Sequence, residues 1–133
     1  MTQFTSVADR CEAIEECYEF MLAYAAQGIV DDRESPNGSQ VRELLARAVE
    51  AATGLPQAYG ALAAKEAAAG PEYEAFLGVL ETDAAKALAA MVLVLAQPRI
   101  SSQLIDNLNA SLHVRTLLTD VFLLDEIVTI GQA

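Results

Sequence analysis

The chain has 133 residues, of which 53% are hydrophobic and 20% charged, and its 19 acidic against 8 basic side chains give a formal net charge of −11. Such a chain is long and apolar enough to fold as a single domain, which excludes a disordered polar protein. Such an acidic surface repels nucleic-acid phosphates and anionic lipid head groups. We therefore expect neither a nucleic acid nor a membrane as partner, and instead a protein with a basic surface.

The apolar segments do not predict a membrane protein. No basic segment followed by an apolar stretch begins the sequence, which argues against a secretory signal. The longest strongly apolar run, residues 87–96, is about half of the ~20 residues that a spanning helix needs. We therefore expect a cytoplasmic protein in which the two cysteines remain reduced thiols.

The first predicted helix begins after Ser6, a favourable N-cap, and ends near Gly28. Its main apolar seam follows alternating spacings of four and three, as in a helix packed lengthwise on others. The seam contains Val7, Cys11, Ile14, Tyr18, Met21 and Ala25. A second apolar stripe contains Ala13, Cys17, Phe20 and Tyr24. This second stripe belongs either to the core of a central helix or to an interface with another subunit or partner, and we favour the interface.

An acidic stripe formed by Glu12, Glu16 and Glu19 lies almost opposite the main seam and so faces away from the core. Carboxylate-bridged metal sites instead need inward glutamates and Glu-x-x-His pairs, and the chain has one histidine and no such pair. Cys11 and Cys17 point about 120° apart on a helix and lack the spacing of a redox or zinc motif. We therefore predict no metal site and no cofactor, and we assign the acidic stripe to partner binding.

Turn residues divide the middle of the chain. Residues 29–39 have no periodicity and predict the main exposed loop, which lacks the ligand pattern of a calcium site. A helix follows at about 40–53, with Gly54 as its C-cap. The next, alanine-rich helix ends at Gly70.

The longest predicted helix covers residues 72 to about 96, after Pro71 and before Pro98. Beyond it, the apolar stripe that carries Ile105 and Leu108 changes side after His113. A straight helix would turn its core face away at that point, so we expect a kink or break near residues 111–114.

These elements predict an all-α, single-domain bundle of five to six helices over residues 1–133, with two long antiparallel helices and a kinked C-terminal helix pair. Residues 87–96 and 117–124 are apolar nearly all round, and a small bundle buries two such segments with difficulty. We therefore expect a homodimer. The alternative is a monomer with two central helices.

The predicted function is non-enzymatic: a self-associating interaction protein that acts as an accessory, assembly or regulatory factor for a partner protein. Its partner-binding residues are Glu12, Glu16, Glu19, Cys17, Phe20 and Tyr24. The alternative is a small-molecule or enzymatic pocket between helices, with Tyr18, Tyr73, His113 and Arg115 as its polar groups. Arg115 is also a candidate for a structural ion pair with Asp125 or Glu126.

Overall fold

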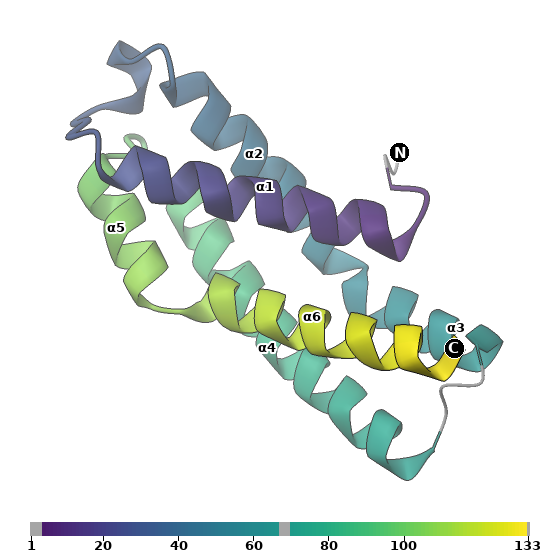
Figure 1. Cartoon of the computed structure of the whole chain (residues 1–133). Helices are drawn as coiled ribbons and strands as arrows, with labels where there is room; N and C mark the ends of the chain where they lie inside the picture. Colours follow the sequence, from purple (N-terminus) through teal and green to yellow (C-terminus); the bar gives the residue numbers. More distant parts are fainter. Residues whose placement is uncertain (1–3, 67–69, 133) are drawn as a thin grey trace.

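The computed structural model describes residues 4–66 and 70–132, which form a helical bundle without a strand (Figure 1). Its elements are α1 (Val7–Ala25), the short 3-10 helix η1 (Asp32–Glu34), α2 (Gly38–Thr53), α3 (Leu55–Glu66), α4 (Pro71–Leu95), α5 (Ser102–Ala110) and α6 (His113–Gln132). The predicted all-α class and the number of helices are confirmed.

Local chemistry sets the helix ends where the sequence predicted them. The Ser6 hydroxyl accepts a hydrogen bond from the Asp9 amide at 3.1 Å and so caps the start of α1. Gly54 is the C-cap of α2, and Pro71 is the first residue of α4. The alanine-rich helix was predicted to end at Gly70; α3 is described as far as Glu66, residues 67–69 lie outside the described residues, and Gly70 is the N-cap of α4.

The two long helices are arranged differently from the prediction. α1 and α4 run in the same general direction in Figure 1, and α2 runs the opposite way and contacts both of them. α2 is therefore an antiparallel neighbour of α1, because the turn around η1 reverses the chain directly after α1, and α6 is a second one (Figure 1). α6 packs on both α1 and α4 and completes the bundle.

A buried ion pair anchors the turn between α1 and α2. Asp32 is 3% exposed, and its carboxylate accepts hydrogen bonds from Arg42 Nε at 2.6 Å and from the Ile100 amide at 2.6 Å. Arg42 also donates to the carbonyls of Leu95 and Gln97, at 3.3 and 3.0 Å, at the end of α4. Within the predicted exposed loop, Arg33 and Glu34 are exposed. Asp32 is instead buried, and it connects this turn to Arg42 of α2 and to Ile100, which follows α4.

The same turn requires glycine at the start of α2. A Cβ atom on Gly38 would lie 1.5 Å from the carbonyl oxygen of Asp32, closer than any side chain permits. The chain can therefore pass this close to Asp32 only with glycine at position 38.

The predicted break between the last two helices is confirmed. α5 ends at Ala110 and α6 begins at His113, and between them Leu112 adopts a left-handed φ of 66°. Ile105 is fully buried before the break and Leu117 after it, so the chain changes direction while both apolar stripes stay in the core.

Candidate functional site

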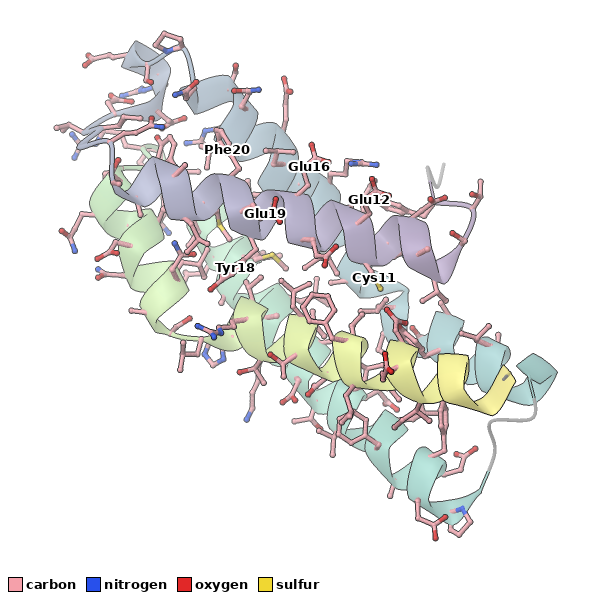
Figure 2. All side chains as sticks on the ribbon, in the orientation of Figure 1. Cys11, Glu12, Glu16, Tyr18, Glu19 and Phe20 are labelled. Carbon is pink, nitrogen blue, oxygen red and sulfur yellow. The ribbon has the colours of Figure 1, made fainter. Side chains whose placement is uncertain are left out.

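The acidic stripe of α1 lies on the surface. Glu12, Glu16 and Glu19 are all exposed, and Figure 2 shows Glu12 and Glu16 on the side of α1 that faces away from α6. Glu16 approaches Arg47 of α2 at 3.6 Å, a pair in which both side chains are about half exposed. Such a surface pair contributes at most about 1 kcal/mol, so it leaves the stripe available to a partner.

The second apolar stripe of α1 belongs mainly to the core. Cys17 and Tyr24 are fully buried, and the Tyr24 hydroxyl donates to the Ile100 carbonyl at 2.7 Å. Phe20 is partly buried and packs on the Tyr24 ring with 6.1 Å between the ring centroids. Cys17 and Tyr24 therefore cannot reach a partner in this fold, which corrects their assignment to an interface. These side chains are buried because α2 and α5 pack on α1 and cover this side of it.

The two cysteines are free and buried, and neither is suited to nucleophilic chemistry at neutral pH. Burial raises the pKa of Cys11 to about 11 and that of Cys17 to about 12. Cys11 Sγ lies 3.5 Å from the Tyr59 hydroxyl, which in turn donates to Asp125 Oδ1 at 2.5 Å. This polar chain ties α1, α3 and α6 together at one end of the bundle.

The four polar residues of the predicted pocket do not converge. Tyr18 and Arg115 line the same groove, whereas Tyr73 and His113 are not among the residues of that groove. Tyr73 is buried at the start of α4, and its pKa is raised by burial and by the nearby charge of Asp125. His113 is the first residue of α6. A pocket built from all four residues is therefore not formed.

The groove that holds Tyr18 and Arg115 lies between α1 and α6 and has a volume of about 520 Å³. We call it the α1–α6 groove; its lining residues are Glu15, Tyr18, Glu19, Leu22, Arg115, Leu118, Thr119 and Phe122. Leu22 and Phe122 are 51% and 49% exposed, so large apolar side chains lie open between charged residues of both helices. Figure 2 shows Tyr18 on the side of α1 that faces α6.

The groove continues onto the solvent side of α6. We call this surface the α6 outer face and define it by Arg115, Thr119, Phe122, Leu123, Glu126 and Ile127, all exposed. Leu123 and Ile127 are 50% and 42% exposed, whereas Leu117 and Leu124 on the opposite side are buried. The apolar composition of residues 117–124 indicated that this helix is apolar on every side, and the structure identifies the side that the chain itself leaves uncovered.

Sequence reasoning missed Leu22, Leu123 and Ile127 as surface residues. The all-round apolar composition of residues 117–124 was the available signal, but it does not say which side of the helix packs inward. Leu22 gave no signal of its own, because its exposure depends on where α6 packs along α1.

A pair of carboxyl groups lies at the contact between α4 and α6. Asp120 is 9% exposed, and its carboxyl group is within hydrogen-bond reach of Asp83. Burial, together with that hydrogen bond and the charge of Asp83, raises the pKa of Asp120 to about 7. No donor among the described residues reaches the buried Oδ2 of Asp120, so nothing there offsets the cost of a charge on this carboxyl group, and its protonated form is favoured up to about neutral pH.

The described part of the chain contains neither a cluster of metal-ligand side chains nor a helix able to span a membrane. Among those residues, no three histidine, cysteine, aspartate or glutamate side chains come together as ligands. No helix within residues 4–66 and 70–132 is both long and apolar enough to cross a bilayer.

Comparison of the chain with protein-family models, with curated proteins and with solved structures gives no match. No relative therefore supplies a function, and a proposal has to come from the surface chemistry of the chain itself.

Proposed function

We propose that this chain is a non-enzymatic, self-associating interaction protein that acts as an accessory, assembly or regulatory factor for a partner protein. The observation that supports it is the continuous apolar surface formed by the α1–α6 groove and the α6 outer face. Phe122, Leu123 and Ile127 follow one another along one helix, each 42% to 50% exposed. Exposed apolar side chains gathered in one patch are typical of a protein interface, whereas scattered ones are ordinary.

The surface offers two regions of different chemistry. The α6 outer face carries three large exposed apolar side chains, Phe122, Leu123 and Ile127, and suits the second copy of the chain, because burying them removes apolar surface from water. The acidic stripe on α1 suits a partner with a basic surface, because its exposed glutamates present negative charge to the solvent. Self-association through α6 leaves Glu12 and Glu16 accessible, since they point away from α6 (Figure 2).

A second candidate function uses the same groove. Tyr18 and Arg115 place a hydroxyl and a guanidinium beside the apolar side chains of Leu22 and Phe122. An apolar ligand with an uncharged hydrogen-bonding group would fit this combination, because a few polar groups in an apolar pocket fix the orientation of a ligand, whereas Glu15 and Glu19 in the same groove disfavour a carboxylate. Occupation of the groove by such a ligand and by a second copy would be mutually exclusive.

Phe122→Asp is expected to convert a dimer of the 14.2 kDa chain into a monomer, because a carboxylate at this position would lose its hydration in the interface. We expect the dissociation constant to rise by about 100-fold or more, measured by light scattering over a range of protein concentrations. The matched control is Val92→Asp on α4, since Val92 is also 49% exposed but lies outside the proposed surface. A wild-type chain that is monomeric at every concentration would contradict self-association.

Charge reversal of the outward part of the acidic stripe, with Glu12 and Glu16 replaced by lysine, is expected to abolish binding of the basic partner and to leave the dimer intact. Glu19 is left unchanged in this variant because it lines the α1–α6 groove. The measurement is a comparison of the proteins that wild type and variant retain from a lysate, with each retained protein then purified and titrated. The control reverses Glu74 and Glu81 of α4, which are also exposed. If wild type and the α1 variant retain the same proteins, the acidic stripe does not bind the partner.

A further inference from the structure

The α6 outer face carries opposite charges at its two ends. Arg115 and Glu126 lie about three helical turns apart, so they point to the same side of α6. Thr119 and Phe122 lie between them on that side, and all four residues are exposed. The predicted ion pair between Arg115 and Glu126 or Asp125 within one chain is not formed, because about three turns of helix, roughly 16 Å, separate them.

Neither charged residue forms an ion pair within the described part of the chain. The ion pairs there join Arg33 to Asp31, Arg42 to Asp32 and Arg47 to Glu16. Arg115 and Glu126 therefore both present charge beside an apolar surface. At an interface such charges select the partner and its orientation more than they add affinity.

We infer, building on the proposed function, that the occupant of this surface is a second copy of the chain whose α6 packs antiparallel on α6 about a two-fold axis, with Arg115 of each copy paired to Glu126 of the other. A parallel pairing would bring arginine against arginine and glutamate against glutamate. The antiparallel pairing replaces both repulsions with two equivalent attractions, as the two-fold symmetry requires.

The same register matches the shapes of the side chains. If position 115 lies opposite position 126 of the second copy, Thr119 lies opposite Phe122, and this contact is made twice. A small side chain facing a large one lets two helices approach closely and interdigitate. Each Phe122 ring then passes from about half exposed to enclosed, next to the α1–α6 groove of the other copy.

Two single charge reversals test the pairing. Arg115→Glu and Glu126→Arg each place like charges at both contacts of the homodimer, so each is expected to weaken its own dimer by about 10-fold or more. Mixing the two variants in equal amounts restores both attractions, because one chain then carries two glutamates and the other two arginines. We expect light scattering to show monomers for each variant alone and a heterodimer of near wild-type affinity for the mixture.

The mixture also separates an effect on pairing from an effect on folding. Arg115 lines the α1–α6 groove together with Glu15 and Glu19 of its own chain, and no second chain could relieve a repulsion created within that groove. If the Arg115→Glu chain fails to fold, Arg115→Gln and Glu126→Gln keep the test possible, with each expected to weaken the dimer by about 3-fold. Arg99→Glu and Glu81→Arg, both at exposed positions, are the matched controls.

The outcomes distinguish this pairing from the proposed function. A wild-type dimer that Phe122→Asp disrupts, but that the mixture does not restore, would overturn the antiparallel pairing and leave self-association through this surface intact. A wild-type chain that stays monomeric at every concentration would overturn both the antiparallel pairing and self-association. The occupant of the surface would then be a different protein.

Discussion

Replacement of Asp32 by alanine is expected to lower the free energy of unfolding by about 3–5 kcal/mol. The substitution leaves the partly buried guanidinium of Arg42 without its counter-ion and removes the acceptor of the buried Ile100 amide. Losing one member of such a pair costs more than the pair itself contributes, because the remaining Arg42 charge stays partly shielded from water without its counter-ion. Guanidinium chloride denaturation followed by helical circular dichroism measures the loss.

The neighbouring Asp31 provides the control. It pairs with Arg33 at 2.7 Å, but the Arg33 side chain is 65% exposed, so Asp31→Ala is expected to cost less than about 1 kcal/mol. Equal losses for Asp31→Ala and Asp32→Ala would contradict the structural role of Asp32.

The pH dependence of the Asp32→Ala loss gives a second readout. Burial alone would raise the pKa of Asp32, but the hydrogen bonds from Arg42 and Ile100 bring it below its usual value. The stabilisation by this carboxylate is therefore present above the unfolded pKa of about 4 and disappears as the pH falls further. The difference between wild type and Asp32→Ala should accordingly shrink below pH 4.

The parts of the fold that depend on local chemistry were predictable from sequence. Ser6 and Gly54 act through backbone groups within a few residues of themselves, and Pro71 needs only a first helical turn. The break before His113 was predictable for a similar reason, because an apolar stripe that changes side cannot remain on one straight helix.

The unpredicted features depend on residues far apart in the chain. Asp32 was expected in an exposed loop, because nothing near it in sequence reveals that Arg42 and the Ile100 amide will surround its carboxylate. Cys17 was assigned to an interface because a helix apolar on two flanks looks the same whether its second neighbour is α2 of the same chain or another subunit.

The candidate surface was predictable only in part. The apolar excess of residues 117–124 indicated that something must cover them, and the acidic stripe was correctly placed on the outside of α1. Which side of α6 stays open depends on where α4 and α1 pack, and that is a property of the whole bundle. Sequence thus indicated an apolar excess around this helix, whereas the location of its exposed part, at Phe122 and Leu123, required the structure.

Asp120→Asn is expected to stabilise the protein by about 1–3 kcal/mol at pH 8 and to have little effect at pH 5. The folded pKa of Asp120, about 7, lies above the unfolded value of about 4. The folded state therefore holds a proton that the unfolded state releases, and stability falls as the pH rises from about 4 to about 7. Asparagine carries no charge, and its amide can donate to Asp83 as the protonated carboxyl does.

Denaturation of wild type and variant at both pH values measures this effect, with Asp106→Asn at an exposed position of α5 as the control. The stability of wild type should fall between pH 5 and pH 8 more than that of Asp120→Asn, and the Asp106→Asn curve should follow wild type. If instead Asp120→Asn destabilised the protein equally at both pH values, the two carboxyl groups could not be sharing a proton. Asp120 would then act as an ionised acceptor, and the contact between α4 and α6 would depend on its charge.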